Sequence, residues 1–333
     1  MSAATLPSKM LAYATNQRSL LGTLWHAATH FSIGHQTSIR EVDLPVLEQG
    51  DVLVKVKAVA QNPTDFKHID LLGRPNSIIG CDFAGRVVKV GAHAKGNWRE
   101  GDRIAGVVHG GLYPDRGSYA EYLKVDSDLA WKIPDAVTDE EAATFGVSAV
   151  SAMQALILNL RLPWPNETST ALPRDAKKII LIYSGATSAS LFAIQLAKLA
   201  GFHVITTCSP RSRELVLGYG ADTVFDYRDP DALTKIIREY PDLRLAFDGF
   251  SDGKSTEFCC NAVVKSSGKV VSLDPMAKSK SLGVELVPML MYTVFGRPFA
   301  LLQPVGPKYA ASLADRAGLA RFYAALPGLI TNR

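Results

Sequence analysis

Short runs of apolar residues, several of them alternating with polar ones, mark the first 135 residues of the chain. In 51–59 the alternation is partial, as in a strand with one buried face. Glycine and aspartate at the borders of these runs indicate tight turns. The runs stand at 51–59, 81–91, 101–108 and 117–125. This pattern predicts a barrel-like β domain.

The pattern changes at Thr138, which is followed by Asp139, Glu140 and Glu141, as in the first turn of a helix. From there to about residue 290, buried strand-like runs alternate with helix-like segments. Alternating strands and helices predict a doubly wound α/β domain with a parallel sheet.

The apolar run 179–183 and the segment after it form the clearest candidate for a ligand site. The run has the length of a strand covered on both faces, and Gly185 stands in the turn that follows. In the helix expected next, Phe192, Leu196 and Leu199 are spaced to face the sheet. Backbone N–H groups at a helix start have no partner inside the helix and attract an anion. The segment therefore predicts a dinucleotide pyrophosphate site, although only one glycine of the usual fingerprint remains.

The next strand-like run, 203–208, is followed by Ser209, Pro210, Arg211 and Ser212. NAD-binding units usually carry Asp or Glu at this point, to bind the ribose 2′-hydroxyl. Hydroxyl and guanidinium groups suit the dianion of a 2′-phosphate instead. The sequence therefore predicts a preference for NADPH.

Composition narrows the class of protein. The chain has 333 residues, enough for two domains, and 47% of them are hydrophobic and 20% charged. The net charge is only +4 and no basic run carries interleaved aromatics, so neither nucleic acid nor a membrane is expected as a partner. The four cysteines have neither disulfide-scaffold nor metal-ligand spacing, which favours a cytoplasmic location.

Two segments stand outside the regular pattern. The first, 19–35, contains His26, His30 and His35 without cysteine or acidic support, so we expect a loop or a short helix rather than a metal site. The second, 162–173, is rich in Pro, Ser and Thr and is expected to be an exposed loop.

Four motifs of the β domain resemble those of the medium-chain dehydrogenase/reductase superfamily, in that superfamily's order. They are QNPTDFK at 61–67, GCDFAG at 80–85, GDRI at 101–104 and GSYAEY at 117–122. The resemblance covers roughly residues 38 to 333.

Within this superfamily the chain resembles the fungal trans-acting enoyl reductases, which work with iterative polyketide synthases, as in lovastatin assembly. The segments that carry this closer resemblance are 183–189, 208–211, 224–227 and the proline-rich loop.

The resemblance implies a Rossmann-type doubly wound parallel sheet and a GroES-like β-barrel domain. The expected domains are a GroES-like catalytic domain at 1–145, an NADPH-binding Rossmann domain at 146–298 and a return to the catalytic domain at 299–333. Members of the family continue beyond the point equivalent to Arg333 with a helix and a strand that complete the β domain, so the last part is expected to be shortened.

Zinc-dependent members of the superfamily need a Cys and a His-Glu pair in the first two motifs. Those positions carry Gln61, Asn62 and Pro63 in one motif, and Cys81 and Asp82 in the other. A tetrahedral zinc site cannot be assembled from these residues, so the resemblance implies a zinc-free reductase.

The chemistry implied is conjugate reduction of an α,β-unsaturated thioester with NADPH. Charge develops on the thioester oxygen, and a proton must reach Cα. In the resembling family Lys67 faces the reacting region and is the candidate catalytic residue. It could stabilise an oxyanion, bind a phosphate or relay a proton, and a solvated surface lysine is the alternative. No general acid is evident.

The resemblance also implies which residues line the cofactor and the substrate. For the cofactor these are Thr64, Asp65, Phe66 and Lys67 beside it, Gly185, Ala186, Thr187, Ser188 and Ala189 at the pyrophosphate, Ser209, Pro210, Arg211 and Ser212 at the 2′-phosphate, Tyr227 near the adenosine ribose, and Leu273 and Asp274 at the nicotinamide carboxamide. For the substrate they are Ser148, Ala149, Val150, Val294, Phe295, Gly296 and Arg297. Simple helix packing is an equal alternative for Ser148 and Ala149.

Three functions remain open at this point. The first is an NADPH-dependent enoyl reductase of secondary metabolism that acts in trans on an intermediate tethered to the acyl carrier protein of a polyketide synthase. The second is a free-standing NADPH oxidoreductase for quinones or small enones. The third is a non-catalytic NADPH-binding protein.

Overall fold

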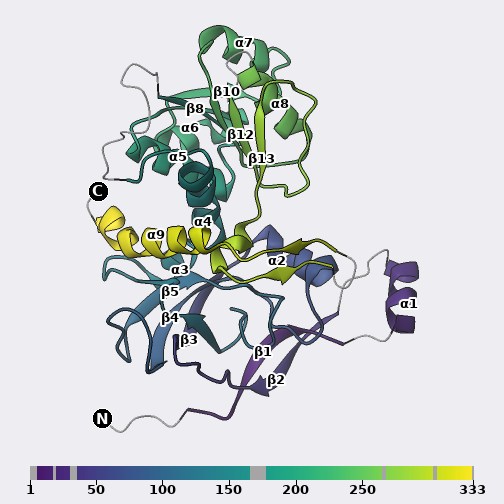
Figure 1. Ribbon diagram of the computed structural model, residues 1–333, viewed down its shortest axis with the longest axis vertical. Helices are drawn as coiled ribbons and strands as arrows, with labels where there is room; N and C mark the ends of the chain where they lie inside the picture. The colour runs from purple at the N-terminus through teal and green to yellow at the C-terminus, as the bar shows by residue number, and fades with distance from the viewer. Residues whose placement is uncertain are drawn as a thin grey trace. The chain divides into compact units, whose positions relative to one another are not determined.

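The computed structural model describes residues 6–17, 20–30, 36–165, 178–264, 268–302 and 306–331. The chain forms two compact units (Figure 1). One contains Met1–Val147 and Tyr292–Arg333, and the other is the continuous stretch Ser148–Met291. The chain therefore passes between the units twice. Most of the proline-rich loop, together with His35, lies outside the described residues.

An antiparallel five-stranded sheet forms the centre of the first unit (Figure 1), with its strands in the order β6-β3-β4-β5-β7. They are β3 (Asp51–Ala60), β4 (Asp82–Val90), β5 (Arg103–Val107), β6 (Tyr122–Asp126) and β7 (Ala130–Lys132). The side chains of Val54, Phe83 and Ile104 are fully buried in its core. The partial alternation seen in the sequence corresponds to the second half of β3, whereas the first four residues of this strand are all buried. The first three expected strands are confirmed.

The fourth expected strand, 117–125, begins later than the sequence indicates. Gly117 lies against the backbone of Ile78, where a Cβ atom would come within 2.3 Å of the carbonyl oxygen. The N–H groups of Ser118 and Tyr119 then donate to carbonyl oxygens of the loop before β4. The segment pairs with that loop first, and β6 starts only after this turn.

Further elements complete the first unit. The strands are β1 (Lys9–Thr15), β2 (Thr37–Asp43), β14 (Phe299–Ala300) and β15 (Lys308–Tyr309). The helices are α1 (Leu20–His30), α2 (Pro63–Lys67), the π-helix η1 (His68–Leu72), α3 (Asp139–Ala143), the 3-10 helix η5 (Met291–Phe295), which begins at the second passage between units, and α9 (Leu313–Thr331). Helix α3 begins as predicted, because the Glu141 N–H donates to Thr138 Oγ1 over 3.1 Å and the Thr138 N–H donates to Glu141 Oε2 over 2.9 Å.

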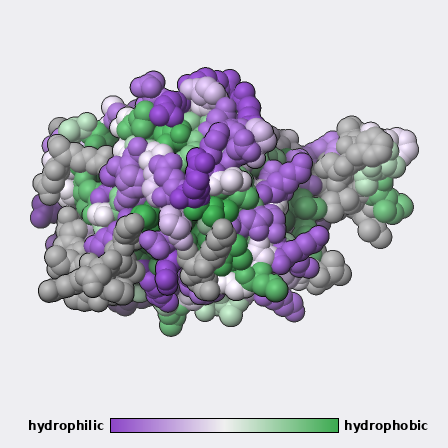
Figure 2. All heavy atoms as spheres, turned by 90° about the horizontal axis from the view of Figure 1, so that it is seen from above, coloured by the Kyte–Doolittle hydropathy of each residue, from purple (hydrophilic) through white to green (hydrophobic). Residues whose placement is uncertain are grey.

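Helix α1 joins β1 to β2 and projects from them (Figure 1). Of the two alternatives for 19–35, the short helix is therefore confirmed over the described residues. Leu21, Leu24 and Trp25 lie on one side of it at helical spacing and are exposed. Figure 2 shows hydrophobic side chains on this projection, at the right of the view.

A parallel six-stranded sheet with helices between its strands forms the second unit, in the order β10-β9-β8-β11-β12-β13. The strands are β8 (Ile179–Tyr183), β9 (His203–Cys208), β10 (Thr223–Asp226), β11 (Leu245–Asp248), β12 (Lys269–Ser272) and β13 (Glu285–Pro288). The helices are α4 (Val147–Met153), the π-helix η2 (Gln154–Asn159), α5 (Ser188–Leu199), the 3-10 helix η3 (Pro210–Ser212), α6 (Arg213–Gly218), α7 (Ala232–Glu239) and α8 (Lys254–Val263). The doubly wound parallel sheet is confirmed, and the carboxyl ends of its strands share one edge.

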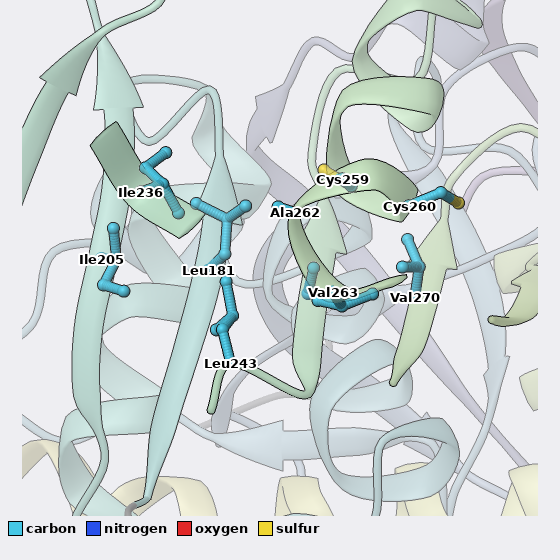
Figure 3. Close-up of a cluster of buried hydrophobic side chains, with 10 residues drawn as sticks. Leu181, Ile205, Ile236, Leu243, Cys259, Cys260, Ala262, Val263 and Val270 are labelled. Atoms are coloured by element: carbon cyan, nitrogen blue, oxygen red, sulfur yellow. The ribbon is translucent and has the colours of Figure 1, made fainter. Parts of the chain in front are cut away.

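One apolar core of this unit lies between the sheet and helices α7 and α8 (Figure 3). Leu181 and Ile205 come from the central strands, and Ile236 and Val263 come from the two helices. All four side chains are almost completely buried. This burial explains why the strands read as continuous apolar runs.

Helix α5 faces the sheet with a different stripe from the predicted one. Its buried side chains include Ala193, Leu196 and Ala197, whereas Leu199 is 41% exposed and Phe192 only half-buried. Ile194 is fully buried as well, so the buried face runs through Ala193, Ile194 and Ala197, with Leu196 8% exposed at its edge. The prediction was therefore right for Leu196 and wrong for Leu199.

A group of ion pairs fastens α9 to the rest of the first unit. At its centre is Asp126, the last residue of β6, which is 8% exposed. Its carboxylate accepts a hydrogen bond from each of three arginines, Arg116 (2.9 Å), Arg297 (2.8 Å) and Arg316 (2.8 Å). Burial disfavours the charged carboxylate, but the guanidinium groups outweigh this and hold the pKa of Asp126 below its usual value.

Replacing Arg316 by alanine is expected to lower the free energy of unfolding by about 2 kcal/mol, because the buried Asp126 loses a partner. A carboxylate with a lowered pKa stabilises the fold above its ordinary pKa, and this contribution disappears as the pH falls through the lowered value. The difference in free energy of unfolding between R316A and wild type, measured with urea, should therefore be larger at pH 7 than below about pH 4. The control is Arg238→Ala on the exposed side of α7. Equal stability of R316A and wild type at pH 7 would contradict the prediction.

Candidate active site

The turn between β8 and α5 passes unusually close to β9. A Cβ atom on Gly185 would lie 2.1 Å from Thr206 Oγ1, so only glycine permits this approach. The Ser184 N–H donates to Thr207 Oγ1 over 3.0 Å, and the Gly185 N–H donates to the Thr207 carbonyl oxygen over 2.8 Å. These contacts continue the pairing of β8 and β9 into the turn and fix where α5 begins.

The first turn of α5 leaves backbone N–H groups directed outward. Thr187 is the N-cap, and its Oγ1 accepts the Ser190 N–H. The Ser190 hydroxyl, at the position of the missing third glycine, donates inward to the Tyr183 carbonyl oxygen over 3.3 Å. The N–H groups of Ser188 and Ala189 have no partner within the helix, as is usual at a helix start. An anion such as a pyrophosphate can be bound there.

The carboxyl ends of β9 and β10 carry hydroxyl and guanidinium groups. Ser209 precedes η3 as its N-cap and Ser212 is its last residue, and their hydroxyl oxygens lie 3.3 Å apart. Arg211 between them is exposed and makes no hydrogen bond or ion pair with another described residue. After β10, the Arg228 guanidinium lies 5.4 Å from the ring centroid of Tyr227. Arg228 is a further cation at this edge that the sequence analysis missed.

The segment after β12 is held by a buried network at the end of β11. The Leu273 N–H donates to Ser251 Oγ over 2.8 Å, and the Asp274 N–H donates to Ser272 Oγ over 3.3 Å. The fully buried Asp248 accepts the Ser251 N–H over 2.9 Å. Ser251 has φ +63°, which is unusual for a residue other than glycine. Ser251 could have been recognised from the sequence as a candidate site residue, because it follows a strand of the parallel sheet.

The second unit thus gathers its predicted cofactor residues at one edge of one sheet. The positions 185–189, 209–212, 227 and 273–274 follow the carboxyl ends of β8, β9, β10 and β12, respectively. In doubly wound folds this edge is where ligands bind.

In the first unit, Thr64, Asp65, Phe66 and Lys67 lie in the short helix α2. Lys67 is its last residue. The side chains of Phe66 and Lys67 are exposed, and that of Asp65 is buried. Lys67 makes no hydrogen bond or ion pair with another described residue. Its ammonium group is therefore available to a ligand.

Asp65 of α2 and the neighbouring Asp82 are two buried carboxyl groups. Asp65 Oδ2 accepts the Asn62 N–H over 2.7 Å and the Tyr119 hydroxyl over 2.9 Å. Asp82 Oδ2 accepts Asn62 Nδ2 over 2.9 Å, and Asp82 Oδ1 accepts the Val147 N–H over 2.7 Å. Neither carboxyl group forms an ion pair with a described residue. Burial therefore raises the pKa of Asp65 and raises the pKa of Asp82 to about 8.

A hydroxyl and two imidazoles form a second buried group next to α2. The Tyr292 hydroxyl is hydrogen-bonded to Thr64 Oγ1, and its ring stacks on that of His109 with centroids 3.8 Å apart. His68 Nδ1 lies 2.8 Å from the Thr64 carbonyl oxygen and donates to it. Burial lowers the pKa of both His68 and His109 and raises the pKa of Tyr292. These groups are neutral at physiological pH.

The predicted substrate residues after Tyr292 pack within the first unit. Val294 is fully buried, and Phe295 stacks on His109 with centroids 5.6 Å apart. Gly296 has φ +63°, a conformation that favours glycine. Arg297 is engaged with Asp126, as described above. Their role toward a substrate stays a prediction.

The other predicted substrate residues begin α4. Ser148 is half-buried, whereas Ala149 and Val150 are fully buried. Of the three, Ser148 alone presents an accessible side chain.

Sequence reasoning missed several residues of these buried groups. The Asn62-Pro63 pair was a usable signal, because Asn at the N-cap and Pro at the first position mark a helix start. No local pattern marks Tyr292 or His109. Within the described residues, no group of three or more His, Cys, Asp or Glu is arranged to hold a metal ion. No helix among them is both long and apolar enough to cross a bilayer.

Comparison with known proteins connects this geometry to a family. The family model of the alcohol dehydrogenase GroES-like domain matches residues 48–135. The trans-enoyl reductase TOXD of Cochliobolus carbonum is 38% identical over 275 residues, which cover 82% of this chain and 91% of that protein. The trans-enoyl reductase thnE of Trichoderma harzianum is 36% identical over 309 residues, which cover 89% of this chain and 83% of that protein.

A solved structure shows the same fold. An alcohol dehydrogenase superfamily protein from Novosphingobium aromaticivorans superposes with a TM-score of 0.74 at 22% identity, covering 97% of this chain and 87% of that one. The resemblance drawn from the sequence motifs is therefore confirmed, and the protein is an oxidoreductase that acts on carbon–carbon double bonds. The chain belongs to the medium-chain dehydrogenase/reductase superfamily and, within it, to the trans-enoyl reductases.

Proposed function

We propose that this protein is an NADPH-dependent enoyl reductase that acts in trans on a polyketide intermediate. Its substrate is an α,β-unsaturated thioester tethered to the acyl carrier protein of a polyketide synthase. The observation that carries the proposal is the likeness to trans-enoyl reductases over more than four fifths of the chain. A cytoplasmic location fits this role.

The residues of the second unit fit a nicotinamide dinucleotide. The close approach at Gly185 leaves room for a pyrophosphate at the N–H groups of Ser188 and Ala189. Ser209 and Arg211 supply a hydroxyl and a guanidinium without a partner among the described residues, where an NAD-binding unit would carry a carboxylate. This donor set favours the 2′-phosphate of NADPH.

When bound, the nicotinamide supplies hydride to Cβ of the enoyl thioester. The chain's part is to orient the thioester and to stabilise the charge on its oxygen. We assign the second task to Lys67, whose side chain is exposed at the end of α2 and has no partner within the described part of the chain. Thr64 and Asp65 of the same helix are fixed from behind by Tyr292 and Tyr119.

The direct test is deuterium transfer from 4-deuterated NADPH to a pantetheine-linked enoyl thioester, read by mass spectrometry. We expect the label at Cβ, and we expect higher kcat/KM on the carrier-bound thioester than on a free quinone. No label from a protein that still binds NADPH would overturn the assignment. Reduction of the quinone alone would then indicate a free-standing oxidoreductase, and no reduction of either compound a non-catalytic binding protein.

The assignment of the 2′-phosphate site predicts a change in cofactor preference. Arg211→Ala is expected to raise the KM for NADPH about ten-fold, because it removes a charge-assisted contact. The KM for NADH, which lacks the 2′-phosphate, should stay within about two-fold. Initial rates with both cofactors measure this, with Arg238→Ala as the control. An equal loss with the two cofactors would place the 2′-phosphate elsewhere.

The role of Lys67 predicts a selective loss of turnover. Lys67→Ala is expected to lower kcat between about 10- and 100-fold, since it removes a group that stabilises developing charge. Lys67→Arg keeps the charge and should recover part of the rate. Fluorescence titration should give the same Kd for NADPH in all three proteins. Wild-type turnover in Lys67→Ala would refute this role, and weaker NADPH binding with unchanged kcat would reassign Lys67 to a cofactor phosphate.

A further inference from the structure

Asp82 links two segments that are far apart in the sequence. It is the first residue of β4 and is 1% exposed. One of its carboxyl oxygens accepts a hydrogen bond from the side-chain amide of Asn62, which stands just before α2, over 2.9 Å. The other accepts the backbone N–H of Val147 over 2.7 Å. Val147 is the last residue of the first unit and the first of α4.

The turn before Val147 is shaped to make this contact. A Cβ atom on Gly146 would lie 2.0 Å from Asp82 Oδ1, so a larger residue would push the turn away from the carboxyl group. The preceding residue is held as well, since the Tyr323 hydroxyl of α9 donates to the Phe145 carbonyl oxygen over 3.3 Å. The backbone is thus fixed just before the chain enters the second unit.

The second passage of the chain between the units is attached to helix α2. Tyr292, the first residue after it, is hydrogen-bonded to Thr64 in α2. Its ring is also stacked on His109 of the first unit. Both passages of the chain are therefore attached to α2 or to Asn62 immediately before it, and α2 ends in Lys67.

This arrangement is costly for stability alone. Among the described residues, Asp65 and Asp82 are buried without a cation in contact, and burial of a carboxyl group without a charged partner is costly. The hydrogen bonds from Asn62 and Val147 offset part of this cost at Asp82. They also supply a fixed direction, because hydrogen bonds are directional and hydrophobic contacts are not.

We propose that Asp82 and Tyr292 are positioning residues of the first unit, which fix Val147 and the segment after Met291 to α2 so that Lys67 keeps a defined orientation during reduction. Neither residue takes part in the chemistry. The inference rests on the proposed enoyl reduction and adds to it the residues that set the geometry of the site.

The test compares an apolar and a conservative replacement of Asp82. Asp82→Leu keeps the branched shape and removes both acceptors, so we expect lower thermal stability, because the Asn62 amide and the Val147 N–H lose their acceptor, and about ten-fold lower kcat per folded protein on the pantetheine-linked thioester. Asp82→Asn retains an acceptor for the Val147 N–H and should recover part of the rate. Tyr292→Phe, which keeps the stacked ring but loses the hydroxyl, should also lower kcat. The matched controls are Asp135→Asn, at an exposed position, and Tyr240→Phe in the second unit.

Three outcomes decide the matter. Lower kcat per folded protein with unchanged Kd for NADPH supports the proposal. Wild-type kcat in Asp82→Leu overturns it, and so does a loss of kcat only in proportion to a loss of folded protein. If Asp82→Leu does not fold, Asn62→Ala, which removes the same hydrogen bond from the other side, takes its place.

A second measurement does not depend on the substrate. Hydrogen exchange in wild type and Asp82→Leu should show faster exchange both at 144–150 and in α2, because the two segments share this link. Faster exchange at 144–150 alone would overturn the proposal even if the enzyme is active. If wild type fails to reduce the thioester while exchange rises in both segments, the proposed function fails and the structural link stands.

Discussion

The close contact between Gly185 and Thr206 is the constraint on which the second unit's site depends. Thr206 Oγ1 donates to the Ile182 carbonyl oxygen over 2.6 Å inside the sheet, and it also fills the space where a side chain at 185 would lie. The turn can follow this path only without a Cβ atom, and the path sets where α5 starts. A turn that follows this path therefore needs only this one glycine, provided that the neighbouring strand supplies the rest of the constraint. Ser190 can likewise stand where a third glycine is usual, because its hydroxyl donates to the Tyr183 carbonyl oxygen.

Local sequence patterns predicted most of the elements and little of their contacts. The strands at 51–60, 82–90 and 179–183 and the capped helix at 139–143 follow from alternation, apolar runs and capping residues, which act over a few positions. Leu199 was misplaced because the buried face of α5 runs through Ala193, Ile194 and Ala197 instead. The late start of β6 depends on hydrogen bonds to residues about 40 positions earlier, which no local pattern contains.

The buried polar groups of the first unit could not be predicted for the same reason. The motif 61–67 and the motif 80–85 were visible in the sequence, but the bond from Asn62 to Asp82 requires the fold that brings them together. The contact between Thr64 and Tyr292 joins residues from opposite ends of the chain. Sequence motifs thus indicated which residue types matter, whereas tertiary structure decides which of them act on a ligand and which hold others in place.

The insertion of one continuous unit into another has a consequence for how the protein is made. During synthesis, residues 148–291 leave the ribosome as a complete sheet with its own core and can fold at once. The earlier 147 residues cannot finish, because Asp126 and His109 lack Arg316 and Tyr292 until the last segment has been translated. The nascent chain therefore holds an incomplete β domain for the whole time needed to translate the inserted unit. We expect chaperones in the producing cell to bind mainly the first unit, because its translation begins first and ends last.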